Sequence, residues 1–127
     1  MPVKTSSEKD HTKMFDTSNL ILDRWECTNE QKLAIMGISE SVLIQYLQGE
    51  TSVVLSTDQL QRLHFIDAID AALRATFTIP KNIYGFMRLH NNNAFFDGRT
   101  PLSIISSGDI LSLQEVFTRI NNISRAQ

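Results

Sequence analysis

Only one cysteine, Cys27, occurs among the 127 residues of this sequence, so no disulfide can form within the chain. No group of cysteines and histidines has the spacing of a zinc site, and we therefore expect no bound metal. The sequence also lacks an apolar run long enough to cross a membrane and an apolar leader segment. These absences indicate a cytoplasmic protein with no membrane partner.

A surplus of basic residues is also missing. The chain has 12 lysines and arginines against 14 acidic residues, which gives a formal charge of −2. Any affinity for DNA therefore has to come from a local patch. His90 and Asp97 lie near each other in sequence, but no nucleophile motif or phosphate-binding glycine loop accompanies them. We predict a binding protein rather than an enzyme, with no catalytic residues and no cofactor.

Helical periodicity is what the sequence does contain. No strand pattern appears, apart from an ambiguous apolar run at residues 53–55, so we expect an all-α fold of about seven helices. Residues 1–15 have almost no aliphatic side chains and are predicted to form a flexible arm. Residues 16–55 and 56–127 are predicted to form two helical units that share one long helix.

That long helix should start at Ser56, Thr57 or Asp58 and extend to about Phe77, a span on the order of 30 Å. Its predicted apolar stripe consists of Leu60, Leu63, Ile66, Ile69, Leu73 and Phe77. Asp67, Asp70 and Arg74 are expected on the opposite side, with Asp70 and Arg74 spaced for a weak ion pair. His64 lies among apolar residues and is expected to be packed rather than to bind a ligand. In the first helix, Trp25 is expected in the core.

Residues 33–49 have the spacing of a helix-turn-helix motif. Gly37 should end the first helix and Ser39 should cap the second, with Ile38 closing the corner between them. The side chains that could read bases are Ser39, Ser41, Gln45 and Gln48. No basic residue lies between Lys32 and Arg62, so phosphate contacts should be few. We expect weak or absent DNA binding unless five cations gather on one surface: Lys4, Lys9, Lys13, Arg24 and Lys32.

Residues 92–109 contain several residues that favour a turn, a helix start or a helix end. Gly98 is suited to a left-handed turn, Thr100 to a helix N-cap and Pro101 to the first helical position. Gly108 should end this short helix, and Asp109 should cap the one that follows. Two helices are therefore expected to meet at a fixed corner.

At these two stretches the chain resembles the Xre/MbcA/ParS antitoxins. The C-terminal match consists of Phe86-Met87, the asparagines at 92 and 93, Gly98-Arg99-Thr100-Pro101-Leu102, and Gly108. The N-terminal match is the helix-turn-helix spacing of residues 33–49. The resemblance implies a C-terminal toxin-binding unit, a partner toxin of the NAD-consuming RES type, and operator binding by a homodimer.

The candidate toxin-binding residues are Asn92, Asn93, Asp97, Gly98, Arg99 and Arg119. Arg99 is the best single anchor, because a guanidinium can bond a carboxylate at two points. Four apolar residues in this small chain also favour a homodimer: Val53, Val54, Leu55 and Phe65. The alternative function is a helix-turn-helix transcriptional repressor that acts without a toxin partner.

Overall fold

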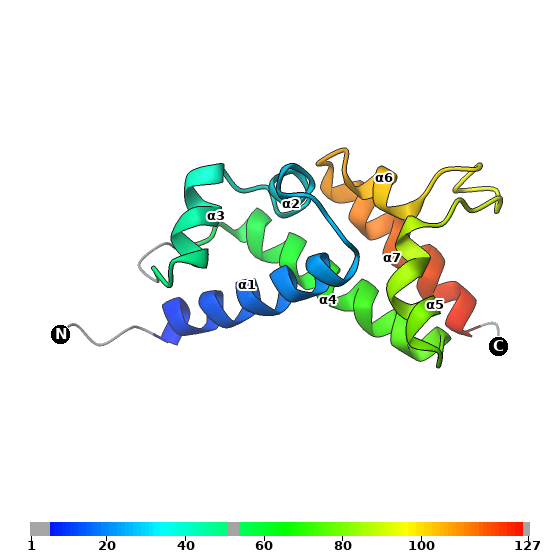
Figure 1. Cartoon of the computed structure of the whole chain (residues 1–127), viewed down its shortest axis with the longest axis horizontal. Coiled ribbons are helices and arrows are strands. Elements are labelled where there is room, and N and C mark those ends of the chain that lie inside the picture. Colours follow the sequence, from blue (N-terminus) through cyan, green and yellow to red (C-terminus); the bar gives the residue numbers. More distant parts are fainter. Residues whose placement is uncertain (1–5, 51–53, 126–127) are drawn as a thin grey trace.

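A computed structural model describes residues 6–50 and 54–125 (Figure 1). Within these ranges the regular elements are all helical, so the predicted all-α class is confirmed. In chain order they are α1 (Ser6–Arg24), α2 (Asn29–Met36), α3 (Glu40–Leu47), α4 (Thr57–Thr76), α5 (Pro80–Gly85), the 3-10 turn η1 (Phe86–Arg88), α6 (Pro101–Ile105) and α7 (Ile110–Arg125). The predicted long helix is α4, which packs against α1, α2, α5 and α7.

The first helix begins at Ser6, well before the predicted start near Asp16. The expectation of a flexible arm is therefore wrong for residues 6–15, while residues 1–5 lie outside the described residues. Phe15 is only 1% exposed, and its ring stacks on Tyr46 of α3 with 4.4 Å between centroids. The Leu55 N–H donates to Nδ1 of the buried His11 at 3.1 Å. These contacts hold α1, at His11 and Phe15, against α3 and the segment before α4.

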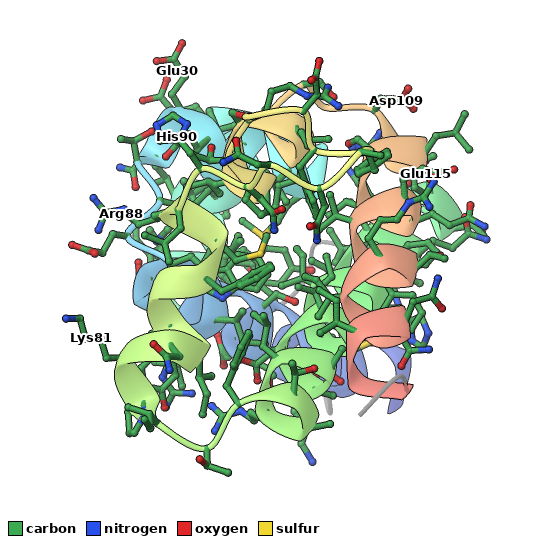
Figure 2. The ribbon with its side chains drawn as sticks, turned by 90° about the vertical axis from the view of Figure 1, so that its right-hand side faces the viewer. Glu30, Lys81, Arg88, His90, Asp109 and Glu115 are labelled. Atoms are coloured by element: carbon green, nitrogen blue, oxygen red, sulfur yellow. The ribbon has the colours of Figure 1, made fainter. Side chains whose placement is uncertain are left out.

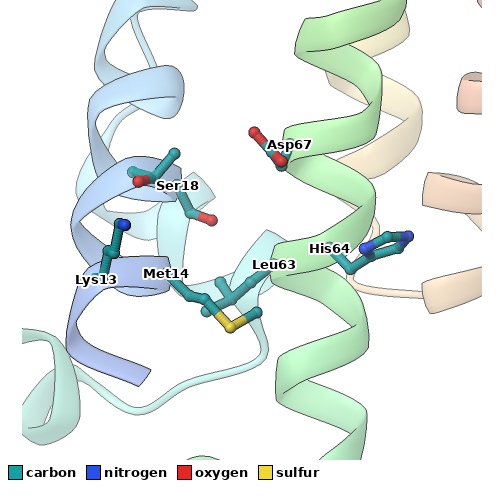
Figure 3. A pocket seen from close by; sticks show the side chains of 7 residues that line it. Lys13, Met14, Ser18, Leu63, His64 and Asp67 are labelled. Atoms are coloured by element: carbon teal, nitrogen blue, oxygen red, sulfur yellow. The ribbon is translucent and has the colours of Figure 1, made fainter. Parts of the chain in front are cut away.

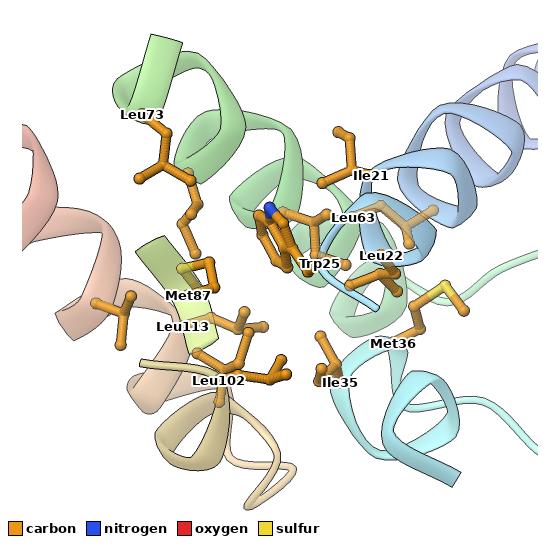
Figure 4. Packing of buried hydrophobic residues seen from close by; sticks show 14 of the residues in the cluster. Ile21, Leu22, Trp25, Ile35, Met36, Leu63, Leu73, Met87, Leu102 and Leu113 are labelled. Atoms are coloured by element: carbon orange, nitrogen blue, oxygen red, sulfur yellow. The ribbon is translucent and has the colours of Figure 1, made fainter. Parts of the chain in front are cut away.

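One continuous hydrophobic core runs through both predicted units (Figure 4). Within the described chain, α5 and η1 each contribute one buried side chain to this core, and every other helix contributes several. Representative members of the core are Leu22, Trp25, Ile35, Leu63, Leu102 and Leu113. Trp25 is fully buried, as the sequence predicted. Residues 16–55 and 56–127 therefore share one core and are stabilised by the same packing.

Two polar residues of α4, Asp70 and His64, differ in burial from what the sequence predicted. The Asp70–Arg74 ion pair is present, with 2.9 Å between Oδ2 and Nε, but Asp70 is 8% exposed and not on a solvent side. Helices pack on more than one side of α4, so its exposed face is narrow: Asp67 and Arg74 lie on it and Asp70 does not. His64, expected to be packed, is exposed instead.

Arg62 of α4 links the two predicted units directly. Its Nη1 donates to the Gly108 carbonyl at 2.8 Å and lies 3.4 Å and 3.5 Å from the carbonyls of Ala34 and Ile35. Its Nε bonds Asp58 at 2.8 Å. The end of α2 and the corner between α6 and α7 are therefore held by one largely buried guanidinium.

Candidate functional site

The corner between α6 and α7 has the predicted caps at Thr100 and Asp109, but α6 ends at Ile105 with Ser106 as its C-cap, before the predicted stop at Gly108. The Ser103 N–H donates to Oγ1 of Thr100 at 3.0 Å, and Pro101 takes the first helical position. Gly108 follows α6 with a φ of 84°, in the left-handed region that favours glycine. Asp109 Oδ1 accepts a backbone N–H of α7 at 3.0 Å. The two helices thus leave this corner in fixed directions.

The loop before this corner closes on itself through its backbone. The Asn91 N–H donates to the Arg99 carbonyl at 3.1 Å, and the Gly98 N–H donates to the Asn91 carbonyl at 2.7 Å. His90 Nδ1 lies 2.8 Å from the Gly98 carbonyl, to which it can only donate. Asp97 and Gly98 both have a positive φ, at 51° and 82°. Figure 2 shows this loop crossing the end of the molecule from His90 towards α7.

Asn91 organises the loop but was not among the predicted binding residues. Besides its two backbone bonds, its Oδ1 accepts the Asn93 N–H at 2.9 Å. Asparagine commonly bonds the backbone two residues further on, and this was the signal available in the sequence. Asn92, Asn93 and Asp97 project from the organised loop as exposed residues, and Gly98 is half-buried.

Arg99 turns back onto its own loop instead of extending freely into solvent. Its Nε donates to the Phe96 carbonyl at 2.8 Å and its Nη2 to the Phe95 carbonyl at 2.6 Å. Two of its three nitrogens are thus already bonded. Nη1 and the second N–H of Nη2 remain for the predicted two-point contact with a partner, while the two carbonyl bonds fix the loop.

Phe95 brings two of the predicted binding residues together. The guanidinium carbon of Arg119, from α7, lies 4.8 Å from the Phe95 ring centroid, and that of Arg99 lies 5.7 Å from it. Both distances fall within the range of a cation–π contact. We call Phe95, Arg99 and Arg119 the Phe95 platform. Phe95 was not predicted, although an aromatic residue in a polar loop was a usable signal.

Arg119 is the more available cation of the platform. Its side chain is 46% exposed, and its only ion pair within the described residues is a long one, 3.5 Å from Nη2 to Glu115 Oε2. Exposed pairs of this kind contribute little to stability. The guanidinium of Arg119 can therefore bond a partner at small cost, whereas that of Arg99 is held in place by two carbonyls of its own loop.

The predicted DNA-reading residues lie on and before α3. Ser39 Oγ accepts the Val42 N–H at 3.2 Å, so this hydroxyl caps the helix. Ser41 and Gln48 are exposed, and Gln45 is half-buried. The exposed side chains of Ser41 and Gln48 are accessible for contacts with bases, but α3 carries no arginine or lysine that could contact phosphates.

Among the side chains that the structure describes, the cations proposed for DNA binding have separate surroundings. Lys32 is buried, with Nζ 2.5 Å from Asp23 Oδ1 and 2.8 Å from Asn19 Oδ1. Arg24 lies over the ring of Tyr84 in α5, at 5.4 Å. Lys13 lines a groove of about 180 Å³ between α1 and α4 (Figure 3). Lys4 and the Lys9 side chain lie outside the described residues.

The proposed dimer residues are partly used inside the chain. Leu55 is buried, and Phe65 is half-buried with its ring 6.3 Å from that of Phe117. Val54 is exposed, and Val53 lies outside the described residues. The homodimer therefore stays a prediction. Among the four residues named for it, Val54 is the one that the structure describes as exposed.

Two other features bear on chemistry. Burial raises the pKa of Cys27 to about 12, so its thiol stays protonated at neutral pH. Within the described ranges, no group of three or more histidine, cysteine or acidic side chains could hold a metal ion. In the same ranges, no helix has the length and apolar character that a membrane span requires.

Comparisons of this chain with protein-family models, curated proteins and solved structures gave no match.

Proposed function

We propose that this chain is an antitoxin that binds and neutralises a partner toxin through the Phe95 platform and the exposed side chains of its loop. The convergence of Arg99 and Arg119 on one aromatic ring carries the proposal. The resemblance to the Xre/MbcA/ParS antitoxins adds three points to the proposal: the toxin is of the RES type, it consumes NAD, and the antitoxin obstructs its active site. A homodimer and weak operator binding complete it.

The physical support is that the platform is ordered before any partner arrives. The backbone bonds of Asn91 and the two carbonyl bonds of Arg99 fix the loop, so little conformational entropy remains to be lost on binding. Arginine and aromatic side chains also supply a large share of the energy in protein interfaces. Asn92, Asn93 and Asp97 would form the polar rim.

The test is coexpression of this chain with the product of the adjacent open reading frame. We expect that product to arrest growth alone and to be harmless with the intact chain. Arg119→Glu should weaken binding by at least about tenfold and restore toxicity, because it reverses the available charge of the platform. Lys81→Glu, which makes the same charge change at an exposed site on α5, should protect fully.

Two outcomes would contradict the proposal in different ways. If Arg119→Glu and Phe95→Ala both protect like the intact chain, the binding surface lies elsewhere. If the neighbouring product is harmless and no partner is captured, the stand-alone repressor becomes the better account.

DNA binding is expected to be weak, and a gel shift with DNA from upstream of the gene measures it. No shift should appear at about 0.15 M salt, because α3 carries no cation and Lys32 is buried in an ion pair. DNA of unrelated sequence is the control. A sequence-specific shift at this salt concentration would show that the charge argument is wrong and would favour the repressor.

A further inference from the structure

A groove of about 320 Å³ lies between α2 and α3, away from the Phe95 platform. Its apolar lining consists of Leu33, Leu43, Ile44 and Leu47, and its polar lining of Asn29, Glu30 and Glu40. In Figure 1, α3 and the loop that carries Phe95 occupy opposite ends of the molecule. The proposed toxin contact therefore leaves this groove unexplained.

The α3 wall of the groove is open to solvent. Ile44 is 44% exposed and Leu47 is 55% exposed, and their spacing of three residues puts them side by side on the helix. Leu43 lines the same groove and is buried, so the apolar surface extends from Ile44 and Leu47 into the interior. Exposed apolar side chains that join a groove, instead of standing singly, mark an interaction surface.

The rim of the groove is acidic. Within the described residues, the carboxylates of Glu30 and Glu40 form neither an ion pair nor a hydrogen bond, and no basic residue lines the groove. The nearest lysine in sequence, Lys32, is buried and paired with Asp23. A phosphate backbone would be repelled here, whereas a cationic segment would be attracted.

We propose that the groove between α2 and α3 binds a basic amphipathic helix of another protein. Its apolar face would cover Ile44 and Leu47, and its lysines or arginines would pair with Glu30 and Glu40. A short helix suits a groove formed by two helices of 8 residues each. A second copy of this chain fits less well, because a two-fold contact through the groove would bring four glutamates together.

The test uses the full chain and a fluorescently labelled helical peptide with leucines at i, i+3, i+4 and i+7 and lysines at the remaining positions. A counterpart with glutamate in place of every lysine is the matched probe. In fluorescence anisotropy, we expect the lysine peptide to bind at least about tenfold more tightly than the glutamate peptide. The Glu30→Lys/Glu40→Lys variant should reverse this preference.

Two further variants separate this groove from general attraction between charges. Ile44→Ser/Leu47→Ser should weaken the lysine peptide by at least about tenfold without changing the net charge. Asp16→Lys/Asp67→Lys makes the same charge change as the glutamate variant, at exposed sites on α1 and α4, and should retain the preference for lysine. Circular dichroism checks that each variant is folded. If Glu30→Lys/Glu40→Lys unfolds, Glu30→Gln/Glu40→Gln takes its place.

Equal binding of the lysine peptide by the intact chain and by either groove variant would overturn the proposal. So would a dimer, seen in analytical ultracentrifugation, that is lost in Ile44→Ser/Leu47→Ser while the intact chain ignores the peptide. That result would assign the groove to a second copy of this chain. Toxin neutralisation should be unchanged in the groove variants, so failure here is distinguishable from failure of the proposed function.

Discussion

Trp25→Ala should lower the free energy of unfolding by about 3–5 kcal/mol. The Trp25 side chain is fully buried in the core that α1 shares with helices of the C-terminal part. Truncation removes its apolar contacts and leaves a cavity that the surrounding helices can close only in part. Urea unfolding followed by far-ultraviolet circular dichroism measures the change, which should appear as one cooperative transition at lower denaturant.

Trp25→Phe is the matched control and should cost about 1 kcal/mol or less. The indole Nε1 of Trp25 is buried without a hydrogen-bond acceptor among the described residues. Phenylalanine loses some volume but also removes this unsatisfied donor, so the two effects oppose each other. Equal losses for the alanine and phenylalanine variants would mean that the packing around Trp25 has been misjudged. Two separate transitions would mean that the core is not continuous.

Sequence reasoning found several helix boundaries at which the signal is local. Ser56 caps α4, Thr100 caps α6, and Gly37 and Gly108 take positive φ values after the helices that precede them. Each of these depends on one side chain, or its lack, and on backbone groups within three residues. Such interactions leave a pattern in a single sequence because both partners are close together in it.

Long-range contacts left no comparable pattern. The segment before Asp16 looked like an arm because it is polar, yet Phe15 and His11 hold it through residues more than thirty positions away, Tyr46 and Leu55. A helix that is poor in apolar residues can be stable when a few anchors find buried partners. Those partners are known only once the fold is known.

The sequence analysis named two members of the Phe95 platform but not their arrangement. Arg99 and Arg119 were both named, but their meeting at Phe95 depends on the packing of α7 against the loop. The sequence also gave no reason to expect Arg99 to bond the carbonyls of Phe95 and Phe96. The consequence is a change of roles, with Arg119 now the more available anchor.

Arg62→Ala should lower the free energy of unfolding by about 2–3 kcal/mol. The side chain is 12% exposed, and its loss leaves the Gly108 carbonyl without the charged donor that now lies 2.8 Å away. The bond to Asp58 adds little, since that carboxylate is largely exposed. Arg119→Ala, which removes an exposed arginine in a long ion pair, should change stability by about 0.5 kcal/mol or less and is the control.

Gly37→Ala tests whether the guanidinium position itself matters. Gly37 has a φ of 66°, and a Cβ there would lie 2.9 Å from Nε and 3.0 Å from Cδ of Arg62. Alanine should therefore cost about 1–2 kcal/mol for the left-handed backbone and more for displacing Arg62 from Gly108. In the double variant Gly37→Ala/Arg62→Ala, the bond between Arg62 and Gly108 can be lost only once. The cost of the double variant should therefore fall short of the sum of the two single costs by about 1 kcal/mol. Strictly additive costs would mean that the Arg62 side chain makes room for the methyl group without losing its bond to the Gly108 carbonyl.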